Sequence, residues 1–127
     1  MHKSRLAGFI IDCETQDLDG AAKFWSEALG CRIKEPESAA AAELYRNLDS
    51  TALGIHVEVQ QVKHPSRVHL DIEADDIDAE VARLEKLGAK RVQKVHTWWV
   101  MEAPTGQRFC VVRVQNPEFD QSANRWP

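Results

Sequence analysis

Ionisable side chains occupy every second position from residue 67 to residue 73, as Arg67, His69, Asp71 and Glu73. Strict alternation with apolar residues is typical of a half-buried β-strand, because successive strand side chains point to opposite faces. The pattern therefore predicts one polar strand face on which an imidazole lies between a guanidinium and a carboxylate. Such a group is suited to proton transfer near neutral pH.

Two interpretations of this face are open. In the first, Arg67 and Asp71 orient the imidazole of His69 and set its protonation, so that His69 is a general acid or base and all three residues belong to a catalytic site. In the second, Arg67 and Asp71 form a buried ion pair, and His69 bonds to backbone or water.

The next segment is predicted to be the helix that covers this strand. Apolar residues recur at helical spacing within residues 76–87. Asp75 or Asp76 suits the N-cap, and Gly88 suits a left-handed C-terminal cap. We expect the helix to pack on the apolar face of the strand, at Val68, Leu70 and Ile72, which leaves the polar face to look into a cavity.

An internal repeat relates the two halves of the chain. Asp12, Glu14 and Asp17 match Asp71, Glu73 and Asp76 at a constant spacing of 59 residues. Because Asp12 and Asp71 recur in both copies, we expect Asp12 to have a structural role. The chain is therefore one module used twice.

Both copies are predicted to have the order βαβββ. The first should contain strands 6–13, 31–35, 43–48 and 53–62, a helix that begins at Asp17 and ends at Gly30, and either a helical turn or a loop at 37–42. The second should contain strands 67–73, 90–95, 98–102 and 108–114, the helix 76–87 and a turn at 103–106 formed by Pro104 and Gly106.

The modules are predicted to form one domain of α+β class over residues 1–127. Module one spans 5–62, a linker 63–66, module two 67–114 and a polar tail 115–127, which drapes over the surface or frays. Each four-stranded sheet has one face covered by its helix and one bare. Two modules can bury their bare faces by curving into an eight-stranded sheet around a shared cavity.

Composition limits the partners. The formal charge is −4 with no basic run, which argues against binding to nucleic acid or to a membrane surface. No segment has the ~20 apolar residues that span a bilayer, and no signal peptide is apparent, so we expect a cytoplasmic protein. Three cysteines without CxxC spacing favour reduced thiols over disulfides or a structural zinc site.

The chain resembles the vicinal oxygen chelate superfamily, and within it the glyoxalase-like domains of bacteria. The resemblance covers about residues 5–114 and is carried by Asp17-Leu18-Asp19, Phe24-Trp25 and Leu29-Gly30, by Arg67-x-His69-x-Asp71, Asp75-Asp76-Ile77-Asp78 and Leu87-Gly88-Ala89, and by Pro104-x-Gly106-x-x-Phe109-Cys110. It implies a duplicated βαβββ fold around a small-molecule cavity. Activity is a separate question, because one fold hosts many functions.

The resemblance also bears on metal binding. Metal enzymes of the superfamily hold a divalent ion with His, Gln or Glu from the first and fourth strands of a module, and His69 stands at one such position. The equivalent residue of module one is Ile10, and Cys110 stands where the metal enzymes carry Glu. Either His56 or Glu58 could face inward. We expect no cofactor; if an ion binds, its ligands are His69, Glu58 and Cys110, a set that suits zinc better than magnesium or iron.

The functional expectation is a small-molecule-binding homodimer that is a metal-independent lyase or isomerase based on His69. The alternatives are a protein that sequesters a drug or toxin, as bleomycin resistance proteins do, and a metal-dependent lyase or dioxygenase. Cys110 is by default a small apolar strand residue. One of Trp98 and Trp99 must face inward, and we assign the ligand contacts to Trp99, His56, Glu58 and Cys110.

Overall fold

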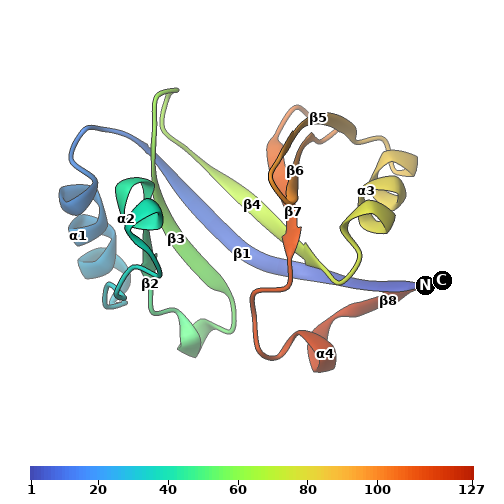
Figure 1. The fold of residues 1–127 in the computed structure, drawn as a ribbon, viewed down its shortest axis with the longest axis horizontal. Coiled ribbons are helices and arrows are strands. Elements are labelled where there is room, and N and C mark those ends of the chain that lie inside the picture. Colours follow the sequence, from blue (N-terminus) through green and yellow to red (C-terminus); the bar gives the residue numbers. More distant parts are fainter. The chain divides into compact units, whose positions relative to one another are not determined.

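A computed structural model describes all residues 1–127, and its α+β class is the predicted one (Figure 1). The strands are β1 His2–Glu14, β2 Tyr45–Leu48, β3 His56–Val62, β4 Arg67–Ala74, β5 Lys90–Val95, β6 Trp98–Glu102, β7 Arg108–Arg113 and β8 Asn124–Trp126. The helices are α1 Leu18–Leu29, α2 Ala39–Leu44, α3 Ile77–Lys86 and α4 Phe119–Ser122, with a 3-10 turn η1 at Thr51–Leu53. None of these helices is long and apolar enough to cross a membrane.

The strands form an eight-stranded sheet in the order β2-β3-β1-β4-β7-β6-β5, and β8 pairs with β1. The chain divides into two compact units. The Phe9–Val68 unit is continuous, whereas the His69–Pro127 unit also includes Met1–Gly8. Strand β1 therefore contributes its first half to one unit and its second half to the other.

In the His69–Pro127 unit, β4 pairs parallel with β7, and β7-β6 and β6-β5 pair antiparallel. The order across this sheet is thus the first, fourth, third and second strand of module two. Strands β5 and β6 have the predicted bounds, and Gly106 closes the predicted turn with a positive φ of 94° and a hydrogen bond from its N–H to the carbonyl of Ala103 at 2.9 Å.

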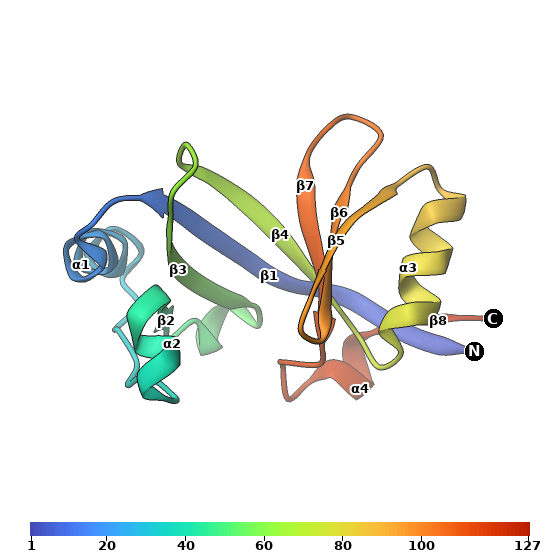
Figure 2. The same ribbon diagram turned by 45° about the horizontal axis from the view of Figure 1, so that its top comes forward.

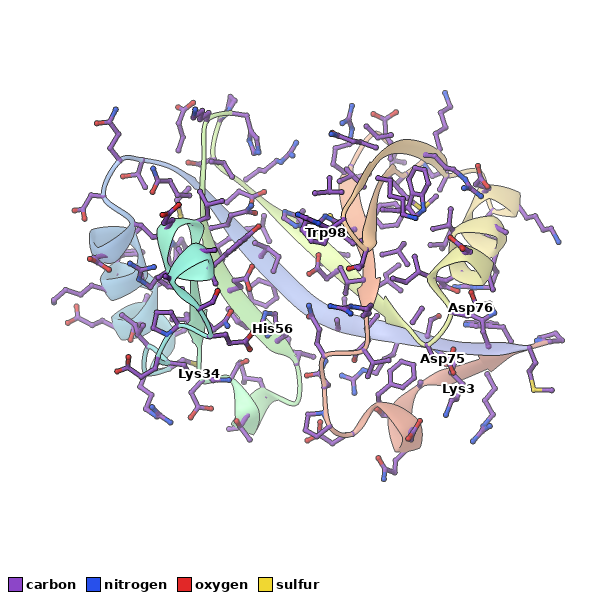
Figure 3. All side chains as sticks on the ribbon, viewed as in Figure 1. Lys3, Lys34, His56, Asp75, Asp76 and Trp98 are labelled. Carbon is purple, nitrogen blue, oxygen red and sulfur yellow. The ribbon has the colours of Figure 1, made fainter.

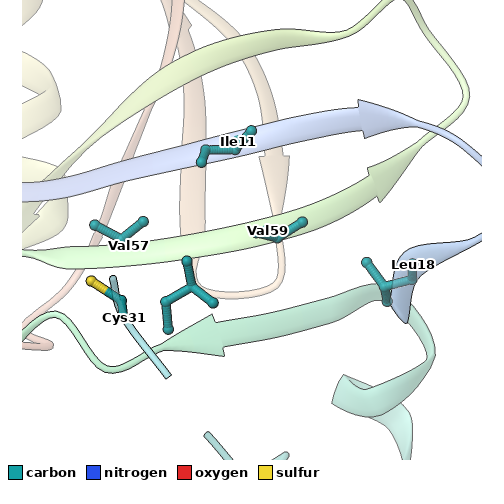
Figure 4. Close-up of a cluster of buried hydrophobic side chains, with 6 residues drawn as sticks. Ile11, Leu18, Cys31, Val57 and Val59 are labelled. Atoms are coloured by element: carbon teal, nitrogen blue, oxygen red, sulfur yellow. The ribbon is translucent and has the colours of Figure 1, made fainter. Parts of the chain in front are cut away.

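In the Phe9–Val68 unit, helix α1 begins and ends as predicted. Asp17 accepts a hydrogen bond from the N–H of Gly20 at 2.9 Å, and Gly30 adopts a left-handed conformation with φ 70°. Apolar side chains of the helix and the strands form the core of the unit (Figure 4), which comprises Ile11, Leu18, Cys31, Leu48, Val57 and Val59.

Module one departs from the predicted strands in four places. Strand β1 begins at His2 rather than at residue 6. The strand predicted at 31–35 is reduced to a single bridge between Ile33 and Leu48, because Pro36 follows at once and removes a backbone donor. Residues 39–44 form α2, capped by Ser38, which shortens the next strand to Tyr45–Leu48. Strand β3 starts at His56 rather than residue 53, since η1 ends at Gly54 with φ 70°.

The prediction that the helix after β4 packs on the whole apolar face of that strand is wrong for the first residues of the strand. Helix α3 packs on β5, β6 and β7 (Figure 2), so it reaches Ala74 and part of Ile72 but leaves Val68 and Leu70 58% and 52% exposed. Two polar residues of β4, Asp71 and Glu73, are buried instead, whereas His69 is half-buried and Arg67 is exposed. A ten-residue helix is too short to cover both the strand end from which it departs and the strand start.

The tail is ordered rather than frayed. Residues 119–122 form α4, with Phe119 buried, and β8 pairs antiparallel with the first residues of β1 through His2 and Trp126 and through Ser4 and Asn124. Figure 1 shows both chain ends at the N-terminal end of β1.

Candidate functional site

The polar face of β4 and β7 gathers three groups with metal-ligating or proton-transferring chemistry. The register places Asp71 opposite Cys110, and His69 is two residues before Asp71 on the same face. One ligand atom each from His69, Asp71 and Cys110 lies within 4.8 Å of the others. His69 Nε2 is 3.5 Å from Asp71 Oδ1, and both side chains are almost fully covered.

Asp71 is the unusual member of the group. The residue is only 5% exposed, yet its Oδ1 atom is buried without a hydrogen-bond partner. Buried carboxylate oxygens normally accept hydrogen bonds, because an unmet acceptor loses its solvation without compensation. This unpaired oxygen could therefore coordinate a cation or accept a hydrogen bond from a ligand.

Arg67 does not join this group, contrary to both interpretations of the polar face. Its Nε lies 3.5 Å from Oδ2 of Asp12, the residue that repeats Asp71 in the first module. Arg67 and Asp12 both belong to the Phe9–Val68 unit. Arg67 therefore pairs with Asp12 and not, as predicted, with Asp71. Arg67 lies at the N-terminal end of β4, whereas α3 packs near the C-terminal end of that strand.

His56 and Glu58 are neighbours in the Phe9–Val68 unit. They are two residues apart on β3, both half-buried, with His56 Nε2 3.3 Å from Glu58 Oε1. Both therefore share a face. Asn47 on β2 lies opposite Glu58, and its Oδ1 is buried without a hydrogen-bond partner. Asn47 is a polar candidate that sequence reasoning missed, although it alternates with the buried Leu48.

The two tryptophans of β6 lie on opposite faces. Trp99 packs against the cluster of Val81, Leu84, Met101 and Val111 beneath α3, with the Arg91 guanidinium 5.1 Å from its ring. Trp98 shares its face with Val100, which pairs with Cys110, and Figure 3 shows it on the side of β6 and β7 away from α3. The tryptophan beside the polar group is thus Trp98 rather than Trp99, a choice that depends on strand register.

Arg108 is a further residue of this face that the sequence did not single out. It precedes Cys110 by two positions on β7, and its Nε lies 3.1 Å from Oε1 of Glu102 on β6. The pair supplies a cation and an anion beside the three ligand atoms.

The donor set does not fit the divalent ions of the superfamily's hard-ion and iron enzymes. One nitrogen, one oxygen and one sulfur differ from the oxygen-rich sites of magnesium and manganese and from the two histidines and one carboxylate of non-haem iron. Ile10, at the equivalent place in module one, is buried and offers no ligand atom. The N, O and S set is one that zinc accepts.

Comparison with protein-family models identifies the family of this chain. A model described as a glyoxalase-like domain matches residues 8–112. The chain belongs to the glyoxalase-like domain family. With it, the chain belongs to the vicinal oxygen chelate superfamily. No curated protein sequence matches the chain.

Solved structures share this glyoxalase-like fold at low sequence identity. A hypothetical protein from Bacillus halodurans C-125 has a TM-score of 0.66 at 10% identity, over 89% of this chain and 96% of that one. Methylmalonyl-CoA epimerase from Mycobacterium tuberculosis has 0.64 at 15%, over 92% and 91%. A variant of 4-hydroxymandelate synthase from Streptomyces coelicolor has 0.58 at 13%, over 90% and 50%. These similarities establish the fold alone.

Proposed function

We propose that this glyoxalase-like domain binds a small organic molecule on the polar face of β4 and β7 and that His69 moves a proton on it. The observation that carries the proposal is the buried carboxylate of Asp71, 3.5 Å from the imidazole of His69. A carboxylate at this distance can orient the imidazole ring and stabilise the imidazolium that forms when His69 accepts a proton.

The supported reaction is a proton transfer beside a carbonyl group. The His69 imidazole removes a proton from the carbon, the Asp71 charge stabilises the imidazolium, and the proton returns to the same or a neighbouring atom. Return of the proton to a neighbouring atom, or delivery of a proton to the opposite face of the same carbon from a second donor, makes an isomerase. Departure of a leaving group with its bonding electron pair, followed by transfer of the abstracted proton to that group, makes a lyase. No electrons leave the substrate, so no oxidant is required.

The comparisons are consistent with this class of reaction. The name methylmalonyl-CoA epimerase denotes inversion at a carbon of an acyl-CoA ester, and two such enzymes share the fold. Trp98, rather than Trp99, is proposed to contact the flat part of the ligand, because it lies on the same face as Cys110. Arg108, which is paired with Glu102 through its Nε, is proposed to contact an anionic group of the ligand through its remaining N–H groups.

We also propose that the chain forms a homodimer. Val68 and Leu70 on β4 are more than half exposed, and a second copy would remove this apolar surface from water. Light scattering should give twice the monomer mass of 14.4 kDa. A monomer would refute this part of the proposal without affecting the chemistry of His69.

Ligand screening followed by isotope exchange tests the function. Metal-free protein is screened by thermal shift against small carboxylic acids, keto acids and acyl thioesters, and the hits are incubated in D₂O and followed by NMR. We expect uptake of deuterium at one carbon, and a loss of about 10²–10⁴-fold in His69→Ala with the thermal shift retained. Asp71→Asn should slow the exchange while binding persists.

His64→Gln is the matched control, because His64 lies in the linker and bonds to the carbonyl of Pro65 at 2.9 Å. It should exchange like the parent protein. Binding without exchange in the parent would instead support a sequestering protein. Exchange that survives His69→Ala would overturn the role of His69.

A further inference from the structure

We propose that His69, Asp71 and Cys110 form a zinc site contained within the second module. Strand β4 supplies the nitrogen and the oxygen, and β7 supplies the sulfur. The proposal that zinc binds stands on this geometry alone. Its consequence for proton transfer, given below, rests on the proposed function.

The spacing of the ligand atoms fits a shared ion better than a hydrogen bond. Ligands at 2.0–2.3 Å from a tetrahedral zinc are roughly 3.3–3.8 Å from one another. His69 Nε2 and Asp71 Oδ1 are 3.5 Å apart, inside that range and beyond the range of about 2.7–3.2 Å for a good hydrogen bond. All three atoms lie within 4.8 Å, so a change of about 1 Å, within reach of side-chain rotation, completes the set.

The neighbouring buried carboxylates show what Asp71 lacks. Glu73 accepts hydrogen bonds from the backbone of Gln115 and from Asn116 at 2.6–3.0 Å. Glu80 is satisfied by Ser4 and Arg83. Oδ1 of Asp71 is equally buried and has no hydrogen-bond donor. A cation bound to this oxygen would compensate for its burial, as hydrogen bonds do for the carboxylates of Glu73 and Glu80.

Charge and ligand type select zinc among the common divalent ions. A zinc ion with one carboxylate and one thiolate is neutral, so the buried group carries no uncompensated charge. A thiolate ligand disfavours magnesium, calcium and manganese. Three protein ligands leave the fourth position of zinc to water or to a ligand, as in catalytic zinc sites.

Zinc binding and proton transfer by His69 exclude one another. The ion takes the imidazole lone pair that would otherwise accept the substrate proton. The metal-free and zinc-loaded forms are therefore two chemical states of one face, and zinc would inhibit the proposed reaction.

Metal titration tests the site directly. Protein freed of metal with a chelator is titrated with Zn²⁺ and, as a spectroscopic probe, with Co²⁺. We expect one equivalent to bind, a rise in melting temperature, a near-ultraviolet band from thiolate-to-cobalt charge transfer, and protection of one thiol from alkylation.

Cys110→Ser should remove the charge-transfer band and weaken zinc binding by more than about tenfold, since the loss of even an outer-shell partner costs that much. Asp71→Asn should weaken binding while the band remains. Cys13→Ser is the control, because Cys13 is also half-buried and free but lies in the other unit. Burial, helped by the charge of Asp12 and opposed by Trp25, raises the pKa of the Cys13 thiol, which further disfavours metal binding there.

Absence of stoichiometric binding to the parent, or a Cys13→Ser variant that loses the band while Cys110→Ser keeps it, would overturn the zinc site. Circular dichroism of metal-free Cys110→Ser shows whether the variant folds; if it does not, Asp71→Asn decides. Deuterium exchange by metal-free parent protein tests the proposed function separately. Exchange without zinc binding refutes only the zinc site, and zinc binding without any ligand or exchange refutes only the proposed function.

Discussion

Nε2 of His2, at the start of β1, lies 2.8 Å from Oε1 of Glu80 on α3, although 78 residues separate them. Glu80 is fully buried and also accepts hydrogen bonds from Ser4 Oγ at 2.7 Å and from two nitrogens of Arg83 at 2.8 Å. This group joins α3 to the first residues of the chain.

Removal of the Glu80 carboxylate should be strongly destabilising. Glu80→Ala leaves His2, Ser4 and Arg83 without their common acceptor, and breaking a buried charged pair costs about 3–5 kcal/mol. Chemical denaturation measures the free energy of unfolding. Glu85→Ala is the control, because Glu85 and Arg91 are each 40% exposed and their pair is worth less than about 1 kcal/mol. Equal losses in the two variants would contradict the prediction.

Stability should depend on pH through the same carboxyl. Burial raises the pKa of Glu80, but hydrogen bonds from Arg83, His2 and Ser4 outweigh it and hold that pKa below the ordinary 4.5. A carboxyl whose pKa is lower in the folded state stabilises the fold above its unfolded pKa, and this contribution is lost as the pH falls through the folded value. The free energy of unfolding should therefore decline below about pH 4.5.

Urea titrations between about pH 6 and pH 3 measure this dependence. In Glu80→Gln the decline should be shallower, because the variant has no proton to bind at this position. Parallel curves for the two proteins would show that other carboxyls account for the acid sensitivity.

Trp126 should hold the last strand in place. The Arg83 guanidinium lies 3.8 Å from its ring, and its Nε1 donates to Ser4 Oγ at 2.8 Å. Trp126→Ala should cost about 2–3 kcal/mol from the lost cation–π contact and hydrogen bond. Hydrogen exchange of the amides of residues 2–4 should accelerate. Arg125→Ala, an exposed change on the same strand, should alter stability by less than about 0.5 kcal/mol.

Alanine substitutions at the two glycines that follow α1 and α3 should distinguish the cost of backbone strain from the cost of a steric clash. Gly30 has φ 70° and nothing within 4 Å of an added Cβ, so Gly30→Ala should cost about 1–2 kcal/mol through backbone conformation alone. Gly88 has φ 108°, and an added Cβ would lie 3.1 Å from Pro104 Cγ. Gly88→Ala should therefore cost about 1 kcal/mol more. Thermal unfolding measures the loss of stability in each variant. Equal losses in Gly30→Ala and Gly88→Ala would contradict the prediction.

The repeat and the short-range signals predicted most of the fold. Alternation located β4, and the repeated order of elements located β5 and β6. The caps at Asp17, Gly30 and Asp76 act through contacts a few residues away, so the local sequence predicts them. The second strand of module one was wrong because its apolar alternation is weak and a neighbouring proline and helix compete for the same residues.

The site was only partly predictable. His69, Asp71 and Cys110 were all named, and their proximity depends on the parallel register of β4 and β7, which the sequence does not specify. The choice of Trp98 over Trp99 and the partner of Arg67 depend on register in the same way. His2, Ser4 and Trp126 were missed because their roles depend on partners more than 40 residues away in the sequence.

Strand β1 also bears on how the duplicated gene can be divided. The repeat boundary lies at residues 63–66, but the second compact unit requires Met1–Gly8 to complete its sheet and to satisfy Glu80. A chain cut at the linker would separate Glu80 from two of its partners, and the second fragment would lack a strand. Division at the repeat boundary therefore does not yield two self-sufficient fragments, because the compact unit of residues 69–127 is completed by the first residues of the chain.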